Sequence, residues 1–339
     1  MSATNRPWSG VWTIAEQRSG RLERLSFELL VWGRALADRR QVPLASVVLG
    51  GRIEATELAE LFERGADLVL LVEAPELAEF RAETFANALC VLVRERRPEI
   101  ILAAASSSGR TLMPYAAMKL GAGLTADCTG LDIEPETGNL LQTRPAIGGN
   151  IMATIRTPER RPQMATVRPR SARPLERQPG RRGELERVDF RPGWADPRAR
   201  VLGFRPNGEE EIDIQAAEVI VAGGRGMKKK DNFARLQHLA VLLGGAVGAS
   251  RDAVDRGWTV YPRQIGLSGK TVVPKLYLGF GVSGSIQHLA GMKTAETIVA
   301  VNSDPDAQIF KVADFGIVAD LFEVLPLLAA RLEKERAKS

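Results

Sequence analysis

The chain has 339 residues, enough for two domains of average size, and 45% of them are hydrophobic while 26% are charged. This composition is typical of a globular protein and argues against long disorder or fibrous repeats. The formal net charge of +5 comes with arginines crowded between Arg156 and Arg205, where no nucleic-acid-binding pattern appears, so a solvated or protein-facing surface is favoured there over a nucleic-acid site.

The first ten residues are too polar and too few to form the hydrophobic segment of a signal peptide. No run of about 18 apolar residues follows them, so no transmembrane segment is expected. We therefore predict a cytoplasmic protein.

The first half of the chain alternates short apolar runs with amphipathic stretches, which is the pattern of a parallel sheet covered by helices. The predicted strands are residues 11–15, 45–49, 68–72 and 100–104. The predicted helices are residues 25–38, 55–63 and 77–96, which carry apolar residues at helical spacing and charge on the opposite face.

The two cysteines give no metal signature. Cys90 lies in an apolar run and Cys128 in a predicted turn rich in threonine and aspartate, with neither CxxC spacing nor companion histidines. A structural zinc or an iron–sulfur cluster is not expected on this chain.

The pattern changes around Pro145. Residues 150–155 and 163–167 alternate as β-strands do, and arginine, proline and glycine then dominate to about Gly208. We predict extra strands followed by an extended connector near residues 170–207. The expected domains are therefore residues 1–207 and 208–339.

The alternation of strand and helix restarts with a predicted strand at residues 219–222, then a glycine-rich turn and a helix that begins near Asp231 or Asn232. Further short strands are predicted at residues 245–248, 276–280, 297–302 and 316–319. The predicted fold class is therefore α/β with two doubly wound parallel-sheet domains, the first nucleotide-binding-like with extra strands and the second smaller.

Two glycine-rich turns in the second domain are candidates for binding a phosphate. The turn at residues 223–226 lies between a strand and a helix, where glycines let backbone N–H groups approach an anion, but the GxGxxG spacing is absent. The turn at residues 281–285 adds serine hydroxyls. A bound dinucleotide and simple chain reversal explain this pair of turns equally well.

Histidine is too scarce for a histidine-based triad or metal cage, because the chain contains only His238 and His288. His238 lies on a predicted apolar helix, where we expect a buried core residue. A bound redox cofactor is favoured over covalent or hydrolytic chemistry.

Several stretches of the second half resemble the FAD domain of electron-transfer flavoprotein alpha subunits, almost without gaps between Val219 and Pro326. They include IVAGGRGMKKKDNF, GAVGASRDAVDRGW, QIGLSGK and GVSGSIQHLAGMKTAETIVAVNSDPDAQIFKVADFGIVADLF. In the first half GLTADCTG and RPAIGGNIMATIRTPERRPQMATVR are similar more loosely. The latter is closer to bacterial members that work with acyl-CoA dehydrogenases or enoate reductases, including electron-bifurcating ones.

The resemblance implies an FAD carrier that works as a heterodimer with an electron-transfer flavoprotein beta subunit. It would take electrons from a flavin dehydrogenase, such as an acyl-CoA dehydrogenase, and pass them to another redox acceptor. One alternative is a subunit of an NADH-dependent electron-bifurcating complex. Another, from a different class, is a nucleotide-binding regulatory module without redox activity.

The resemblance also implies which residues lie beside the flavin ring. Arg251, preceded by Ser250, would lie against the isoalloxazine, where a fixed positive charge favours its reduced anionic forms; the alternative is an interdomain salt bridge. The loop that would pass the flavin N5 edge consists of Gln264, Ile265, Gly266, Leu267 and Ser268. Ser268 keeps a hydroxyl for N5, whereas Leu267 replaces the family's glutamine.

A further element of the resemblance would wrap the pyrophosphate and bring His288 to the flavin C2 carbonyl, where a donor stabilises negative charge; the alternative is a histidine on a helix surface. This element consists of Ser283, Gly284, Ser285, Ile286, Gln287 and His288. Asn302, Asp320 and Leu321 align with positions that contact the adenosine part of FAD. Arg225 aligns with the arginine of the family's GGRG turn.

Overall fold

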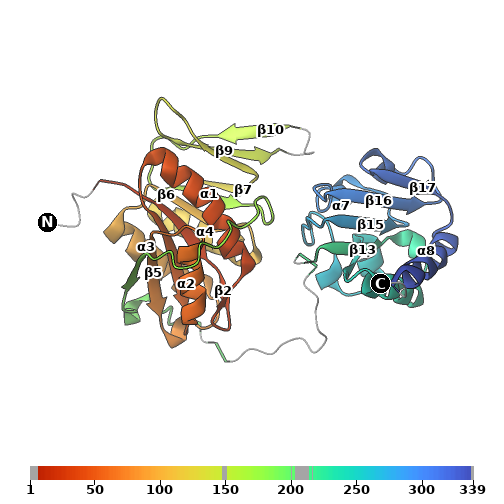
Figure 1. The fold of residues 1–339 in the computed structure, drawn as a ribbon, viewed down its shortest axis with the longest axis horizontal. Coiled ribbons are helices and arrows are strands. Elements are labelled where there is room, and N and C mark those ends of the chain that lie inside the picture. Colours follow the sequence, from red (N-terminus) through yellow and green to blue (C-terminus); the bar gives the residue numbers. More distant parts are fainter. Residues whose placement is uncertain (1–6, 147–150, 200, 203–213, 216, 337–339) are drawn as a thin grey trace. The chain divides into compact units, whose positions relative to one another are not determined.

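The structure is a computed structural model that describes residues 7–146, 151–199, 201–202, 214–215 and 217–336. The chain divides into two compact units, Met1–Phe204 and Arg205–Ser339, called unit 1 and unit 2 below. Each unit contains a parallel sheet with helices packed on it (Figure 1), which confirms the predicted fold class. The predicted boundary between residues 207 and 208 lies outside the described residues.

Unit 1 is built on a seven-stranded sheet in the order β12-β5-β4-β1-β6-β11-β7, in which every neighbouring pair is parallel. The strands are β1 (Val11–Ala15), β4 (Leu44–Gly50), β5 (Leu68–Glu73), β6 (Ile100–Ala104), β7 (Leu124–Cys128), β11 (Gln163–Val167) and β12 (Glu184–Arg187). Every residue of β1, β4, β6 and β11 is buried, as expected for strands covered on both faces.

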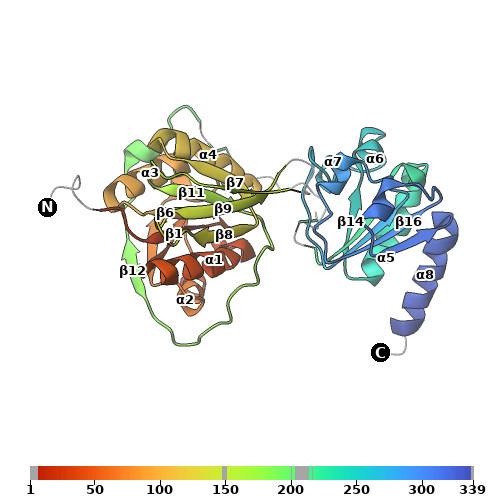
Figure 2. The same ribbon diagram turned by 90° about the horizontal axis from the view of Figure 1, so that it is seen from above.

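Four helices cover this sheet, and Figure 2 shows them on its two sides. They are α1 (Arg24–Arg40), α2 (Ala55–Glu63), α3 (Ala82–Arg96) and α4 (Ser107–Leu120). Leucines of α1 and α2 share one apolar cluster, and those of α3 and α4 share the other. Helix α4 and strand β7 were not among the predicted elements.

The two strands predicted after Pro145, at residues 150–155 and 163–167, correspond to β10 (Met152–Ile155) and to β11 of the main sheet. Strand β10 forms a small antiparallel sheet with β8 (Gly130–Ile133) and β9 (Leu140–Pro145), which were not predicted, and β2 (Gln17–Arg18) pairs with β3 (Arg21–Leu22). The predicted position of Cys128 in a turn is wrong. Its side chain is buried at the end of β7, because this strand packs beside β11 in the main sheet.

The arginine-rich stretch is not simply an extended connector, because much of it packs on unit 1. Strand β12 pairs with β5, and Trp194 is only 4% exposed within an apolar cluster. Its arginines face carboxylates of unit 1, for example Arg181 with Asp67 at 2.8 Å. The prediction of a connector at residues 170–207 is therefore corrected. Up to Trp194 this stretch packs against the rest of unit 1 through strand pairing, apolar contacts and ion pairs.

Unit 2 is built on a five-stranded parallel sheet in the order β14-β13-β15-β16-β17. The strands are β13 (Val219–Gly223), β14 (Ala246–Ala249), β15 (Leu276–Phe280), β16 (Thr297–Asn302) and β17 (Phe315–Val318), and the helices are α5 (Phe233–Leu242), α6 (Arg251–Asp255), α7 (Ile286–Leu289) and α8 (Leu321–Arg336). Since the chain order reverses between β13 and β15, the carboxyl edge there is the place where a doubly wound fold binds a ligand.

The prediction of a buried His238 is wrong. Its side chain is 55% exposed on α5, and its Nε2 lies 3.0 Å from Glu333 Oε1 of α8. The buried side of α5 carries Phe233, Leu236 and Leu239, so position 238 falls on the outer face.

Candidate functional site

The structure brings the predicted site residues together at one edge of unit 2. Arg225 follows β13, Arg251 follows β14, His288 follows β15, Asn302 ends β16 and Asp320 follows β17. Because all five strands are parallel, their carboxyl ends share this edge. The loop of residues 264–268 joins them, since the N–H of Ile265 donates to the carbonyl of Ala249 at 2.9 Å.

The two glycine turns contact each other through their main chains. The N–H of Gly224 donates to Phe280 O at 3.0 Å, and the N–H of Gly226 donates to Gly281 O at 3.0 Å. A Cβ atom on Gly224 would lie 2.2 Å from Gly281 O, and Gly281 has a positive φ of 61°. No side chain fits between the turns, so glycine is required for this close approach, which lies at the edge where a doubly wound fold binds a ligand.

The turn after β14 presents the hydroxyl of Ser250 and the cationic side chain of Arg251, and Arg225 of the turn after β13 adds a second cation at this edge. Ser250 Oγ is buried and has no hydrogen-bond partner among the described residues, although its N–H donates to Gly223 O at 3.0 Å. The side chain of Arg251 is 71% exposed, with Nε 3.2 Å from Asp255, and that of Arg225 is 77% exposed, 4.0 Å from Asp252. An unpartnered buried hydroxyl beside two exposed guanidinium groups fits an anionic, hydrogen-bonding ligand.

Hydrogen bonds hold the loop of residues 264–268 in place, and the side chain of Leu267 at its tip is exposed. Gln264 is buried, and its Nε2 donates to Ser268 Oγ at 3.0 Å. The N–H of Leu267 donates to Gln287 O at 2.9 Å, and a Cβ atom on Gly266, whose φ is +141°, would lie 2.8 Å from that oxygen. Ser268 accepts the bond from Gln264, so its own O–H remains a donor for a ligand.

His288 is held in the core behind this edge. Its side chain is 4% exposed and its Nε2 lies 2.7 Å from the hydroxyl of Tyr277, a contact that the sequence analysis missed. Burial lowers its pKa to about 4, opposed weakly by the nearby backbone of Ile265, so the imidazole is neutral near pH 7. The alternative of a histidine on a helix surface is wrong, whereas the contact with the flavin C2 carbonyl stays a prediction.

The other residues of the predicted pyrophosphate element, residues 283–287, hold the neighbouring loops in place. Ser285 Oγ caps α7 by accepting from the N–H of His288 at 3.4 Å, and the carbonyl of Ser283 accepts from the N–H of Ile309 at 3.1 Å. Gly284 has a positive φ of 80° and lies against Ile309. Ile286 is 70% exposed, which leaves an apolar side chain at the edge.

The residues predicted for the adenosine side support the same edge. The amide of Asn302 bridges two backbone groups, with Nδ2 donating to Val282 O at 2.9 Å and Oδ1 accepting from the N–H of Asp304 at 3.0 Å. Asp320 caps α8 by accepting from the N–H of Phe322 at 2.8 Å, and its other carboxylate oxygen is left for a ligand hydroxyl. Leu321 is buried against Gly226 and Gly281.

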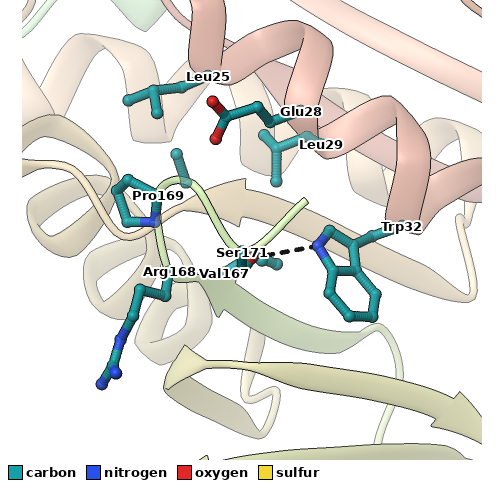
Figure 3. A pocket seen from close by; sticks show the side chains of 9 residues that line it. Leu25, Glu28, Leu29, Trp32, Val167, Arg168, Pro169 and Ser171 are labelled. Carbon is teal, nitrogen blue, oxygen red and sulfur yellow. Dashed lines mark hydrogen bonds between the residues drawn. The ribbon is translucent and has the colours of Figure 1, made fainter. Parts of the chain in front are cut away.

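Unit 1 also has a small hollow, at the carboxyl ends of β6 and β11 (Figure 3). Trp32 Nε1 donates to Ser171 Oγ at 3.3 Å across it, and Glu28 Oε2 accepts from the N–H of Arg170 at 2.7 Å. It has room for about one water molecule, so it does not accommodate a cofactor.

The described residues contain neither a metal-binding cluster nor a membrane-spanning helix. The described ranges contain no group of three or more histidine, cysteine, aspartate or glutamate side chains placed to hold a metal ion. Among the helices that the structure describes, none is long and apolar enough to cross a membrane.

Comparison with known proteins gives matches over both units. Residues 11–192 match the family model of the electron transfer flavoprotein domain, and residues 213–293 match that of the electron transfer flavoprotein FAD-binding domain. Asn302, Asp320 and Leu321 lie beyond the second matched range.

Individual relatives are similar over nearly the whole chain. The electron transfer flavoprotein subunit alpha of Thermoanaerobacterium thermosaccharolyticum is 46% identical, covering 96% of this chain and 98% of the relative. Protein FixB of Clostridium saccharobutylicum is 45% identical, with 96% and 97% covered. The acryloyl-CoA reductase electron transfer subunit beta of Anaerotignum propionicum is 39% identical, with 96% of each covered.

Sequence, fold and site geometry thus lead to one family. Two family models match the two units, and the unpartnered hydroxyl of Ser250, at the same carboxyl edge of unit 2 as the two glycine turns, fits a dinucleotide there. This chain belongs to the electron-transfer flavoprotein alpha subunits, and its second unit is an FAD-binding domain.

Proposed function

We propose that this chain pairs with an electron-transfer flavoprotein beta subunit and relays electrons between a flavoprotein dehydrogenase or reductase and a second redox acceptor. The observation that carries the proposal is the meeting of two glycine turns, Ser250 and Arg251 at one sheet edge, in a domain matched by the FAD-binding model. When bound, FAD supplies one- and two-electron chemistry that no side chain provides.

The residues of the edge divide into three groups by their position. We propose that the glycine turns and the loop of Ser283 and Ser285 bind the pyrophosphate through backbone N–H groups and hydroxyls. Asn302 and the free oxygen of Asp320 would bind the adenosine part, with Leu321 beside it, whereas Arg225 would lie with its glycine turn near the pyrophosphate. This division follows the order of the strands across the sheet.

At the flavin end the proposed roles are electrostatic. The side chain of Arg251 is exposed at the edge, so it would lie beside a ring bound there, where its charge would raise the reduction potential. Ser268 keeps an O–H to donate to N5, and Leu267 supplies apolar contact in place of an amide. Gln264 orients Ser268 through its 3.0 Å hydrogen bond, and Gln287 holds the backbone of Leu267.

The redox partner that we propose is a flavoprotein acting on acyl-CoA thioesters, such as an acyl-CoA dehydrogenase as the electron donor. The support for this substrate class is a relative whose name, acryloyl-CoA reductase electron transfer subunit beta, links it to an enzyme acting on an acyl-CoA. We also propose a cytoplasmic location, which cell fractionation tests.

Co-expression with an electron-transfer flavoprotein beta subunit from the same organism tests the proposal. We expect a yellow heterodimer that is reduced by an acyl-CoA dehydrogenase and its substrate, and a colourless, unstable product when the chain is expressed alone. A stable heterodimer without flavin absorbance would contradict the proposal and favour a nucleotide-binding module without redox activity.

The same preparation distinguishes a second candidate function, the NADH-dependent bifurcating complex. That function requires two FAD molecules per heterodimer and reduction of the flavin by NADH. One FAD per heterodimer and no reaction with NADH would leave the simple carrier.

A further inference from the structure

Tyr277 lies in β15 with its side chain completely buried, and its hydroxyl makes one hydrogen bond to a described residue, to Nε2 of His288 at 2.7 Å. The two rings meet edge to face, with their centroids 6.2 Å apart and an interplanar angle of 62°. Tyr277 therefore fixes the position of His288 from inside the sheet.

The direction of this hydrogen bond follows from burial. Burial raises the pKa of Tyr277, so its hydroxyl keeps the proton. A buried O–H that finds no acceptor is destabilising, and Nε2 of His288 is the acceptor that the structure provides. The hydroxyl of Tyr277 therefore donates, and Nε2 accepts.

A neutral imidazole carries one proton, so an accepting Nε2 leaves that proton on Nδ1. Nδ1 is buried and makes no hydrogen bond of good geometry in the structure. The backbone of Ile265, in the loop that leads to Leu267 and Ser268, is the other polar group that acts on this ring.

We propose that Tyr277 is a positioning residue that selects the Nδ1–H tautomer of His288. The donor left to His288 is then a neutral N–H next to the loop of Ile265, and the fixed positive charge of the site comes from Arg251 instead. Only the relevance of this donor to the flavin rests on the proposed function, because the tautomer is a property of the protein alone.

Nitrogen NMR of the heterodimer labelled with ¹⁵N-histidine tests this proposal, since the two ring nitrogens of each neutral tautomer give distinct shifts and couplings. This chain contributes only His238 and His288, whose signals are assigned with His238→Gln and His288→Gln. We expect His288 to be protonated on Nδ1 in the unmodified protein. In Tyr277→Phe the Nε2–H form should rise to a comparable population.

Tyr261→Phe is the matched control, because Tyr261 also donates its hydroxyl in this region, to the carbonyl of Ser268 at 2.8 Å, but does not contact His288. Its His288 signal should stay that of the unmodified protein. A proton on Nε2 in the unmodified protein, or an unchanged tautomer in Tyr277→Phe, would overturn the proposal.

The test still gives an answer if Tyr277→Phe does not fold or if the heterodimer holds no FAD. If Tyr277→Phe does not fold, the tautomer in the unmodified protein still decides, since Nε2–H contradicts the selection and Nδ1–H supports it. If the heterodimer holds no FAD, the proposed function fails while the tautomer is still measured.

Discussion

The backbone N–H of Gly226 donates to the carbonyl oxygen of Gly281 at 3.0 Å, so the turn after β13 and the turn after β15 are joined main chain to main chain. This contact lies where the strand order reverses, which is the ligand-binding position of doubly wound folds. Both residues are part of the turns that we assign to the pyrophosphate of FAD.

Gly281→Ala should weaken FAD binding by at least tenfold. Its φ is +61° and a Cβ atom would lie 2.6 Å from Gly226 Cα, so the turns must separate. Gly244→Ala is the control, because Gly244 has a φ of +63° with nothing within 4 Å of the added Cβ. Both variants carry the backbone cost of about 1–2 kcal/mol. Fluorescence titration of the heterodimer with FAD measures the difference, and equal affinities would contradict the assignment.

Arg251→Ala should lower the flavin reduction potential and leave the fold intact. Loss of a charge-assisted contact at a partly desolvated site corresponds to about 1–3 kcal/mol. Arg256→Ala is a close control, since both arginines are exposed and each has Nε 3.2 Å from an aspartate of the same short segment. Spectroelectrochemical titration checks this prediction. A potential that does not change in Arg251→Ala, or that falls equally in both variants, would remove Arg251 from the flavin site.

Leu267→Gln, which restores the family's commoner residue, should be tolerated. The side chain is 70% exposed, and the bond that holds this position comes from its backbone N–H to Gln287. We expect a stability change within about 0.5 kcal/mol, as for other exposed positions, together with a shift in the flavin spectrum or potential. Thermal unfolding and the visible spectrum measure both. Loss of FAD would instead show that the loop packs around leucine.

Glu16→Gln should abolish the part of the pH dependence of unit 1 stability that Glu16 contributes. Glu16 follows β1, its Oε1 accepts from Ser106 Oγ at 2.5 Å, and burial raises its pKa to about 7 from 4.5. The folded state therefore binds the proton more tightly than the unfolded state. The stability that protonated Glu16 contributes to folding is fully present below pH 4.5 and is lost as the pH rises through about 7. The amide mimics the protonated form without titrating, so the variant should be the more stable one at pH 8, by about 1–3 kcal/mol.

Urea unfolding between pH 5 and pH 8, followed by tryptophan fluorescence, measures this effect. Unit 1 contributes Trp8, Trp12, Trp32 and Trp194, so the signal reports mainly on it. Glu79→Gln, which removes an exposed carboxylate, should keep the pH dependence of the unmodified protein. A Glu16→Gln variant with that same pH dependence would show that Glu16 titrates normally.

The sequence alone was sufficient for the buried parallel strands and the family. Val11–Ala15, Ile100–Ala104, Leu276–Phe280 and Thr297–Asn302 were predicted with their observed bounds, because continuous apolar runs between turn residues are a local signal. The glycine turns were recognisable for the same reason, although by themselves they did not distinguish a dinucleotide from chain reversal. The resemblance to a family supplied that distinction.

The tertiary structure decided the features that depend on residues distant in the chain. Residues 184–187 have no strong strand pattern, and they form β12 because the edge of β5 offers unpaired backbone groups. His238 is exposed because α5 turns Leu236 and Leu239 inward, which only the packing on the sheet determines. The bond between Tyr277 and His288 likewise requires α7 to fold back over β15, and no local periodicity encodes that contact because its energy depends on burial of both groups at once.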